Sequence, residues 1–475
     1  MNKETKLKPE LPLGFQDRRK EDLRSKNRLI EIVKKNFLLF GFEELETPSF
    51  EISENLGKFL PDKNRPMSGV FGFQDDKSWI SLRYDLTAPL ARFVSKNLDA
   101  LPKPYKRFQI GSVFRNEKPG PGRFREFTQI DADIVGTTNN IADAEVCFLI
   151  SDTLEKIGLK QNQFKINISN RKLIQGLFQD LSITEEKQKL IAIRAIDKLD
   201  RIEIKGVDQL LSKGRKDASG DFTKGAGLKD DQIKKILQFL KSENNLDKIK
   251  KLSSNDLFQQ GISELIEIFD YLKEYSKSNN FVFTPTVVRG IEYYTGAIFE
   301  AALTEKIKNQ KGDFIEFGSI GGGGRYDGLI SRFKVTEYPA TGISIGLDRL
   351  NYAIQQLQSQ SYLNDEPIVI CVIDKNKIKT CFKILDMLRK ARIQSEIYSG
   401  DAGLKAQFKY ADKRNSPAVI IFGDDEEKEN KVSIKNLKKG KKDSVSIDSR
   451  DEWKKSDSQI TVKMDQLINE IKKIL

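Results

Sequence analysis

The stretch "FRNEKPGPGRFREF", residues 114–127, concentrates charge around a Pro-Gly-Pro-Gly tract. The tract at 119–122 predicts the turn of a hairpin, and the residues on either side predict its two strands. Because side chains alternate across a strand, the odd-numbered positions share one face. Arginines beside a stacking ring suit a small anionic ligand with a planar base, although a solvated hairpin face is the simpler alternative. The odd-numbered residues are Arg115, Glu117, Arg123, Arg125, Phe127, Gln129, Asp131 and Asp133.

Two further stretches carry groups that could join this face. In "LRYDLT", Asp85 and Thr87 would lie on one strand face and could bind an ammonium group, or they could simply cap the strand end. In "VVRGIEYYTG", Arg289 is followed by Tyr293 and Tyr294. Paired tyrosines are more often packing residues than ligand contacts. An arginine next to a glycine at a strand end favours a functional interpretation.

A glycine run and a helix start complete the candidate site. "SIGGGGRYDGL" has four consecutive glycines, Gly321 to Gly324, but lacks the Lys-Ser/Thr of a phosphate-binding P-loop. The glycines would allow another backbone or a ligand to approach closely. "TGISIGLDRL" predicts a strand that passes through Gly346 into a helix carrying Arg349. An arginine in the first turn of a helix is unfavourable unless an anion lies opposite, which favours a ligand there.

The missing residue types exclude several mechanisms. The chain of 475 residues contains no histidine, so Ser-His-Asp and Cys-His catalysis and imidazole metal sites are excluded. Its cysteines, Cys147, Cys371 and Cys381, show no CxxC spacing, which argues against a disulfide framework or a usual zinc site. The chemistry must therefore rely on arginines, carboxylates, amides and hydroxyls, together with magnesium if a metal takes part.

Charge and hydropathy indicate a soluble cytoplasmic protein with a polyanionic partner. The net charge is +12, and residues 367–475 hold 24 Lys and Arg against 17 Asp and Glu, which gives +7 there. No apolar run approaches the length of a membrane span, and the polar start "MNKETKLKPE" lacks the core of a signal peptide.

The order of helical and strand patterns predicts several segments. Residues 21–41 have helical spacing, "FEELETPSFE" predicts a short strand stopped by Pro48, and "WISLRYDLTAPLARFV" predicts a strand leading into a helix. The C-terminal part alternates strands and helices, which predicts a largely parallel sheet. The predicted segments are a first core part (1–159), a helical insertion (160–280), a second core part (281–355), a linker (356–366) and an α/β domain (367–475).

Together, these stretches resemble a known family. "FRNEKPGPGRFREFTQ" resembles motif 2 of the class II aminoacyl-tRNA synthetases, "GISIGLDRL" resembles motif 3, and "GFEELETPSFE" resembles motif 1. "VVRGIEYYTGAIFE" and "GGGGRYDGL" resemble stretches peculiar to histidyl-tRNA synthetase. "DAGLKAQFKYADKRNSPAVIIFGDDE" resembles its anticodon-binding domain. The resemblance implies an α+β catalytic core on a mostly antiparallel sheet with a helical insertion, followed by a C-terminal α/β anticodon-binding domain.

By resemblance, individual residues take roles in binding ATP and L-histidine. Arg115 would hold the α-phosphate, Glu117 the adenine side and Arg123 the γ-phosphate, while Phe127 and Arg349 would lie on opposite faces of adenine. Arg289 would contact the substrate carboxylate and the α-phosphate, where related enzymes use a metal ion. The implied histidine-binding residues are Asp85, Thr87, Arg115, Gln129, Asp133, Arg289, Tyr293 and Tyr294.

The resemblance also implies a reaction and partners. Histidine and ATP would give histidyl-adenylate, and the histidyl group would then pass to histidine transfer RNA, in a homodimer with Pro48 at its interface and with Mg²⁺ expected. Gly120 and Pro121 stand where many bacterial members have glutamine and lysine facing the extra 5′ guanosine of the transfer RNA, so we expect that nucleotide not to be read in the usual way. The main alternative is a non-catalytic paralogue that regulates ATP phosphoribosyltransferase. Such paralogues lack the C-terminal domain and commonly lose catalytic arginines.

Overall fold

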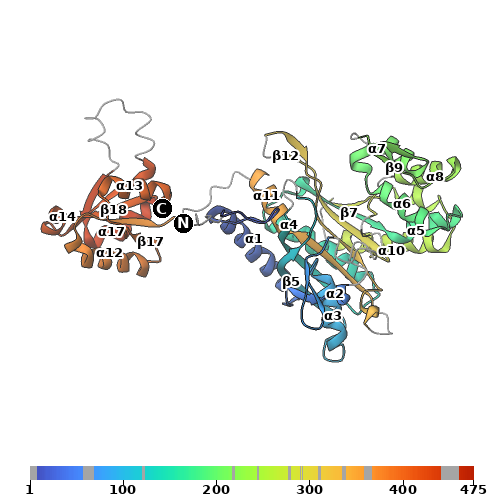
Figure 1. Cartoon of the computed structure of the whole chain (residues 1–475), viewed down its shortest axis with the longest axis horizontal. Coiled ribbons are helices and arrows are strands. Elements are labelled where there is room, and N and C mark those ends of the chain that lie inside the picture. Colours follow the sequence, from blue (N-terminus) through green and yellow to red (C-terminus); the bar gives the residue numbers. More distant parts are fainter. Residues whose placement is uncertain are drawn as a thin grey trace, which may run out of the picture. The chain divides into compact units, whose positions relative to one another are not determined.

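The chain forms two compact units, Met1–Ser359 and Gln360–Leu475 (Figure 1). Their structure is a computed structural model. Among the residues described, no helix has both the length and the apolar composition needed to cross a membrane. The described residues are 8–56, 69–119, 124–216, 220–242, 245–275, 280–288, 290, 293–308, 312–333, 338–357, 366–439 and 459–475.

An eight-stranded sheet forms the centre of the first unit, with the strands in the order β1-β5-β6-β15-β14-β11-β7-β10. The pairings from β5–β6 to β11–β7 are antiparallel, and the edge strands β1 and β10 pair in parallel with their neighbours. The prediction of an α+β core on a mostly antiparallel sheet is therefore confirmed. The strands are β1 (Glu43–Glu44), β5 (Tyr105–Phe114), β6 (Glu126–Val135), β7 (Phe164–Asn170), β10 (Phe281–Phe283), β11 (Ala297–Leu303), β14 (Ser319–Arg325) and β15 (Ala340–Gly346).

The predicted charged hairpin is formed by β5 and β6, which pair along their whole length. Several of its even-numbered side chains, including Phe108 and Ile130, are buried in one core with residues of α1, α4 and α11. The Phe108 ring meets the Phe37 ring of α1 edge to face, with the ring centres 5.6 Å apart. With one face packed on helices, the odd-numbered face is left for a site. The helices of the first unit outside the insertion are α1 (Lys20–Leu39), α2 (Ser53–Leu56), α3 (Thr87–Asn97), α4 (Ile141–Lys156) and α11 (Leu347–Leu357).

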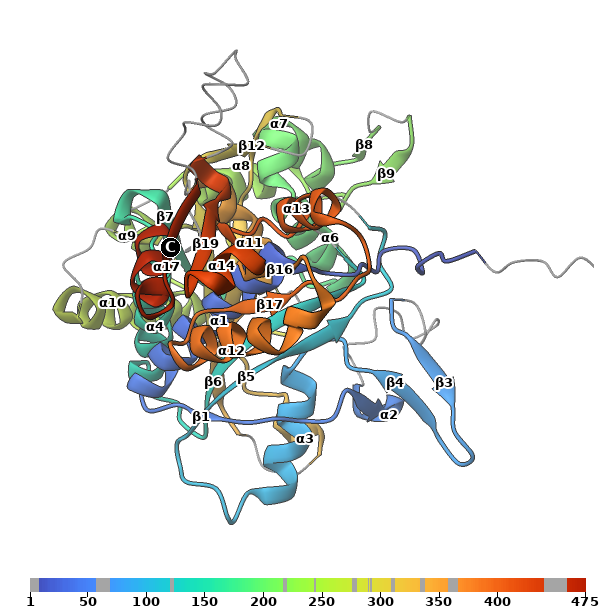
Figure 2. The same ribbon diagram turned by 90° about the vertical axis from the view of Figure 1, so that its left-hand side faces the viewer.

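Two small antiparallel sheets flank the central one. One has the order β2-β4-β3, and its β3–β4 hairpin extends outward at the lower right of Figure 2. It carries Phe50, Ile52 and Phe73 on one face, each about half exposed. The other sheet pairs β12 with β13. These strands are β2 (Phe50–Ile52), β3 (Gly72–Gln74), β4 (Trp79–Leu82), β12 (Lys306–Lys308) and β13 (Phe314–Glu316).

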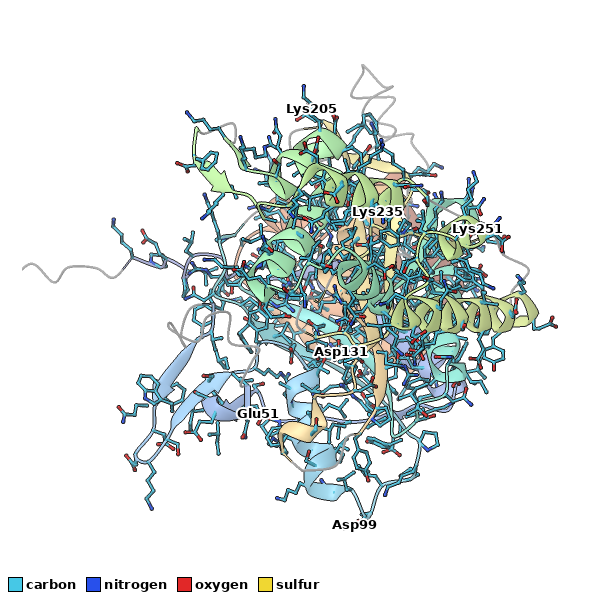
Figure 3. The ribbon with its side chains drawn as sticks, turned by 90° about the vertical axis from the view of Figure 1, so that its right-hand side faces the viewer. Glu51, Asp99, Asp131, Lys205, Lys235 and Lys251 are labelled. Atoms are coloured by element: carbon cyan, nitrogen blue, oxygen red, sulfur yellow. The ribbon has the colours of Figure 1, made fainter. Side chains whose placement is uncertain are left out.

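Helices dominate the segment between β7 and β10. The predicted insertion began at residue 160, but β7 lies inside that range and pairs with β10 and β11 in the central sheet. The alternating apolar residues of "FKINISN" favour a buried strand, and the helices begin only after it. Figure 3 views this segment and labels Lys205, Lys235 and Lys251, which are exposed. Its elements are α5 (Arg171–Asp180), α6 (Glu186–Ile196), α7 (Leu199–Leu211), β8 (Gly214–Lys216), β9 (Phe222–Lys224), α8 (Asp230–Leu240), α9 (Leu246–Lys250) and α10 (Asp256–Tyr275).

The second unit is a five-stranded sheet in the order β17-β16-β18-β19-β20. Helices α12 and α17 pack on one face and α13 on the other. The prediction of a largely parallel sheet is correct for β17, β16 and β18 and wrong for β19 and β20, which pair antiparallel. Only the five-residue α14 separates β18 from β19, which is too short for a parallel crossover. The elements are β16 (Ile368–Val372), α12 (Ile378–Lys390), β17 (Ser395–Ile397), α13 (Leu404–Lys413), β18 (Ala418–Phe422), α14 (Asp424–Lys428), β19 (Lys431–Asn436), β20 (Gln459–Lys463) and α17 (Leu467–Ile474).

Candidate active site

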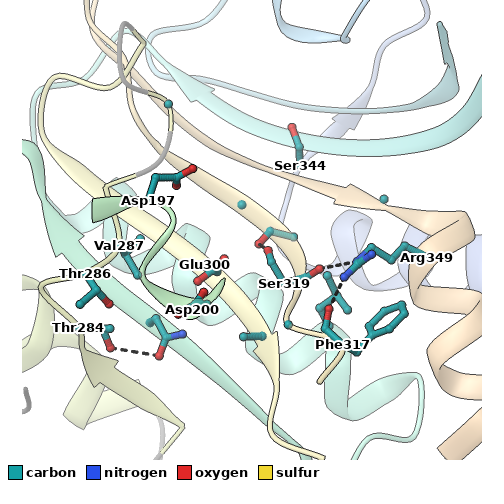
Figure 4. A pocket seen from close by; sticks show the side chains of 18 of the residues that line it. Asp197, Asp200, Thr284, Thr286, Val287, Glu300, Phe317, Ser319, Ser344 and Arg349 are labelled. Atoms are coloured by element: carbon teal, nitrogen blue, oxygen red, sulfur yellow. Dashed lines mark hydrogen bonds between the residues drawn. The ribbon is translucent and has the colours of Figure 1, made fainter. Parts of the chain in front are cut away.

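A cavity of about 1630 Å³ opens on the odd-numbered face of the hairpin in the first unit. Its walls come from β6, β11, β14 and β15, from the start of α11, and from the turn between α6 and α7 (Figure 4). Elements far apart in the sequence therefore meet here. Of the residues predicted for the site, those that line the cavity are Arg115, Phe127, Gln129, Tyr293 and Arg349.

Arg115 is held by contacts that fix its guanidinium group. Its Nε donates to the carbonyl oxygen of Tyr84 at 3.2 Å, and its Nη2 donates to Oε1 of Gln129 at 3.3 Å. The guanidinium carbon lies 4.5 Å from the centre of the Tyr84 ring and 5.1 Å from that of Phe127. Two aromatic faces thus hold a permanent positive charge at the cavity wall, which is favourable for binding an anion.

Glu117, on the same arm, lies next to Tyr84 rather than in the cavity lining. Its Oε1 accepts a hydrogen bond from the Tyr84 hydroxyl at 2.6 Å. Burial, more than any other cause, raises the pKa of Tyr84 to about 12, so this hydroxyl remains a donor at neutral pH.

Arg349 lies in the first turn of α11, as predicted. Its Nε donates to the carbonyl oxygen of Ser319 at 2.7 Å, and a second nitrogen donates to the carbonyl oxygen of Phe317 (Figure 4). Its guanidinium carbon lies 4.0 Å from the centre of the Phe317 ring. The strand β14 and the residues before it therefore keep this cation at the cavity wall.

Asp85 and Thr87 do not lie on a strand, so that part of the prediction is wrong. The strand β4 ends at Leu82, and Asp85 precedes α3. Its Oδ1 accepts from the backbone N–H groups of Thr87 at 3.1 Å and Ala88 at 2.9 Å. A carboxylate before a helix satisfies N–H groups that have no partner within the helix, which explains this position. Thr87 still reaches the site, because its hydroxyl donates to Oδ2 of Asp131 at 3.4 Å.

A buried charge network lies beside the cavity. Nη2 of Arg107 lies 2.7 Å from Oδ2 of Asp133, the Tyr326 hydroxyl donates to Oδ1 of Asp133, and Gln129 donates to Oδ1 of Asp131 at 2.8 Å. Burial lowers the pKa of Arg107, but the carboxylates of Asp133 and Asp131 outweigh this effect and leave that pKa above its ordinary value.

Burial shifts the pKa of both carboxyl groups in this network in the same direction. Burial and then the charge of Asp133 raise the pKa of Asp131 to about 7, although Arg107 acts to lower it. Burial also raises the pKa of Asp133, against the opposing effect of its ion pair with Arg107. Both buried carboxyl groups therefore hold a proton more readily than exposed ones, and the charge of Arg107 opposes this at each of them.

Arg107 and Tyr326 were not among the predicted site residues. Arg107 faces Asp133 directly in the hairpin register, so extending the odd-numbered face back along β5 would have found it. Tyr326 belongs to the stretch "GGGGRYDGL", but strand alternation does not link it to Asp133, because it follows β14 and reaches Asp133 only through the sheet order β6-β15-β14. Between them, Gly342 of β15 lies so close that an added Cβ would come within 2.0 Å of Oδ1 of Asp133.

Three tyrosines pack against one another at this end of the cavity. The Tyr293 ring centre lies 5.2 Å from that of Tyr294 and 5.4 Å from that of Tyr326, both in edge-to-face geometry. Burial raises the pKa of Tyr293 and of Tyr294. Their hydroxyls are therefore protonated at neutral pH.

Four predicted site or loop residues lie outside the described residues: Gly120, Pro121, Arg123 and Arg289. Val288 and Gly290, the neighbours of Arg289, are described. Arg171 at the start of α5 donates to the carbonyl oxygens of Val288 at 3.1 Å and Gly290 at 3.0 Å. Arg171 is buried and was missed by sequence reasoning, since nothing around it resembles a site motif.

Comparisons with known proteins agree with this geometry. Residues 14–350 match the family model described as histidyl-tRNA synthetase, and residues 367–474 match that of an anticodon binding domain. The chain belongs to the histidyl-tRNA synthetase family. It is thus a class II aminoacyl-tRNA synthetase, a histidine--tRNA ligase, with an anticodon-binding domain as its second unit.

Individual relatives are similar to this chain over nearly their full length. A histidine--tRNA ligase of Bartonella quintana (strain Toulouse) is 44% identical over 488 aligned residues, which cover 100% of this chain and 98% of the relative. One from Brucella suis (strain ATCC 23445 / NCTC 10510) is also 44% identical, covering 100% and 97%. The crystal structure of histidyl-tRNA synthetase from Nostoc sp. PCC 7120 is similar with a TM-score of 0.74 and 27% identity, covering 99% of this chain and 100% of the other.

Proposed function

We propose that the cavity binds ATP and L-histidine side by side and that the hairpin holds the nucleotide. Arg115 binds the α-phosphate, and Glu117 contacts the adenine side. Phe127 stacks under adenine, with Arg349 on its other face. Arg123 takes the γ-phosphate. The observation that carries this assignment is that the cations Arg115 and Arg349 and the Phe127 ring line one cavity.

Histidine is proposed to occupy the end of the cavity near the buried charge network. Gln129, Asp85 and Thr87 take part in binding its ammonium group and side chain, together with Asp133. Tyr293 and Tyr294 close around the imidazole ring. Support comes from the short path of contacts that joins Arg115, Gln129 and Asp131.

The two substrates react in two steps. First, a carboxylate oxygen of histidine attacks the α-phosphorus of ATP, and the bond from that phosphorus to the bridging oxygen of pyrophosphate breaks. Negative charge builds on the α-phosphoryl oxygens, which Arg115 and Arg289 stabilise. In the second step, a terminal ribose hydroxyl of histidine transfer RNA attacks the carbonyl carbon of histidyl-adenylate and gives its proton to an oxygen of the adenylate phosphate, while the bond from the carbonyl carbon to that phosphate breaks and AMP leaves. Neither step needs a histidine side chain as base.

The experiment that tests this function is pyrophosphate exchange into ATP with each amino acid in turn. Exchange that depends on histidine alone is expected, because the buried carboxylates and tyrosines match an imidazole that both donates and accepts hydrogen bonds. Exchange with no amino acid would favour the regulatory paralogue instead. That alternative has less support, since residues 367–474 match the anticodon binding domain, which such paralogues lack.

Mg²⁺ is proposed to enter with ATP, bound mainly by phosphate oxygens. Glu300 of β11 lines the cavity and is only 8% exposed, so its carboxylate could supply a protein oxygen ligand. When bound, the ion would neutralise charge on the leaving pyrophosphate. The enzyme would use these substrates in the cytoplasm, where transfer RNA is charged.

Transfer RNA recognition is expected to depart from that of many bacterial relatives. Gly120 and Pro121 cannot donate side-chain hydrogen bonds to the extra 5′ guanosine. Histidine transfer RNA transcripts with and without that nucleotide should therefore be charged at similar rates in an aminoacylation assay. A transcript of another amino acid's transfer RNA serves as the control. A large loss of charging on removing the guanosine would contradict the proposal.

The enzyme is proposed to be a homodimer that pairs through the apolar face of Phe50, Ile52 and Phe73. These side chains are 51%, 48% and 50% exposed and form one apolar surface, and Phe50 and Ile52 closely follow Pro48. We expect Phe73→Glu to shift micromolar enzyme from dimer to monomer in sedimentation equilibrium. Phe222→Glu, at a residue 60% exposed on β9, should leave the dimer intact. A dimer that survives Phe73→Glu would rule out this face.

A further inference from the structure

The carboxylate of Asp348 connects the two sides of the proposed adenine site. Asp348 precedes Arg349 in the first turn of α11. Its Oδ2 accepts a hydrogen bond from the backbone N–H of Thr128 at 2.7 Å, and Thr128 directly follows Phe127 in β6. One hydrogen bond therefore links the residues next to Phe127 and Arg349, whose side chains both line the cavity.

The end of the sheet explains why a side chain makes this link. The pairing of β6 with β15 stops at Gln129 and Gly346, because the chain turns into α11 at Leu347. The backbone of β15 therefore offers no acceptor to the N–H of Thr128, and the Asp348 carboxylate accepts this hydrogen bond instead. A hydrogen bond between an N–H group and a carboxylate is stronger than one between neutral groups.

Two cations from the N-terminal part of the chain stabilise this carboxylate. Nη2 of Arg18 lies 3.1 Å from Oδ1 of Asp348, and Nζ of Lys26 lies 4.0 Å from the same oxygen. Lys26 also donates to the hydroxyl of Thr128. Burial lowers the pKa of Lys26, and the charge of Asp348 opposes that shift. The cluster is mostly buried, with side-chain exposures of 17% for Arg18, 14% for Lys26 and 10% for Asp348.

We propose that Asp348 is a positioning residue that sets the spacing between the Phe127 ring and the Arg349 guanidinium, and so the fit of the adenine ring. The proposal rests on the proposed nucleotide site. Arg349 is already fixed on its other side by the carbonyl groups of Phe317 and Ser319. Asp348 fixes β6 relative to the same helix turn. A flat ring bound between two such groups loses affinity when their spacing changes by even a fraction of an ångström.

A purely structural role would have a different signature. Removing an ordinary stabilising contact would lower the melting temperature, and it would weaken the binding of every ligand or of none. A positioning role acts on ligands that contain adenine and spares the others. AMP and pyrophosphate, which carry different parts of ATP, distinguish these cases.

The test compares wild-type enzyme with Asp348→Ala and Asp348→Asn by calorimetric titration. For Asp348→Ala, the dissociation constants of AMP and ATP should rise about tenfold, the loss expected for a hydrogen bond to a charged group. Those of pyrophosphate and histidine should stay within about twofold, the scatter expected for a ligand that does not touch the altered group. Asp348→Asn keeps an acceptor oxygen and the size of the side chain, so it should lose less and is the variant to use if the alanine protein does not fold.

Asp270→Ala is the matched control, since Asp270 is an exposed residue of α10 in the same unit, paired with Lys273. It should bind all four ligands as the wild type does. Equal weakening of AMP and pyrophosphate, or unchanged AMP binding, in both Asp348 variants would overturn the proposal. Binding is measured without turnover, so a failure of the proposed function would show separately, as wild-type enzyme that binds AMP but gives no histidine-dependent exchange. Wild-type enzyme that does not bind AMP would overturn both.

Discussion

Replacing Arg115 with alanine is expected to lower the rate of histidine-dependent pyrophosphate exchange by about 10²–10³-fold. That is the usual loss when a group aimed at charge developing in the transition state is removed. Arg115 is a suitable group because Tyr84, Phe127 and Gln129 already hold its guanidinium before any ligand binds. The measurement is kcat and the KM values for ATP and histidine in the exchange assay.

Two further variants make this result interpretable. Arg115→Lys keeps the charge but loses the planar fork, so its rate should fall between those of wild type and Arg115→Ala. Arg389→Ala is the control, because Arg389 lies in the second unit, where it donates to the carbonyl oxygen of Ser395. Its exchange rate should be normal. A rate for Arg115→Ala within a few-fold of wild type would contradict the proposed contact with the α-phosphate.

Replacing Arg107 with methionine is expected to cost about 3–5 kcal/mol in the free energy of unfolding, because it removes the cation from a buried ion pair. The Arg107 side chain is fully buried, and the carboxylates of Asp131 and Asp133 would remain beside the cavity without it. Histidine binding should weaken as well, since Asp133 loses its main ion-pair partner. Chemical denaturation gives the stability, and calorimetric titration of histidine gives the affinity.

A double variant separates the charge effect from packing. With Asp133→Asn, the carboxylate that Arg107 neutralises is gone, so Arg107→Met should cost less than in the wild-type background. The double variant should therefore be more stable than the sum of the single effects predicts, while histidine binding stays weak. Strictly additive losses would show that Arg107 stabilises the fold by packing alone.

Local sequence patterns predicted much of the fold correctly, and several of the residues they single out line one cavity. The hairpin, the strand-to-helix step before α3, the start of α11 and the alternating second unit all follow from alternation, turn residues and helix signals, which act over short distances. For the same reason, the alternation of side chains along a strand is enough to place Arg115, Phe127 and Gln129 on one face. The wrong or missing assignments share a different cause. They depend on what lies next to an element in space.

Asp85 shows this difference within one short motif. Its sequence context allowed a strand face or a cap. In the structure it caps, because the N–H groups at the start of α3 have no partner within the helix and the Asp85 carboxylate accepts their hydrogen bonds. The prediction of a parallel second sheet failed at β19 for a similar reason, because the direction of that strand depends on how the chain returns after β18. In neither case does the local sequence contain the neighbour that decides the outcome.

By itself, the sequence determined the family and the hairpin, because residue types and short spacings carry that information. It also determined that no histidine side chain takes part in catalysis, because the chain contains none. Only the tertiary structure decided that Tyr326 meets Asp133, that Arg171 donates to the carbonyl groups of Val288 and Gly290, and that Asp348 reaches Thr128. Each of these contacts joins segments brought together by the sheet order or by helix packing. Burying charged groups together costs free energy, which the folded core offsets. No local sequence pattern therefore shows which of these groups are buried together.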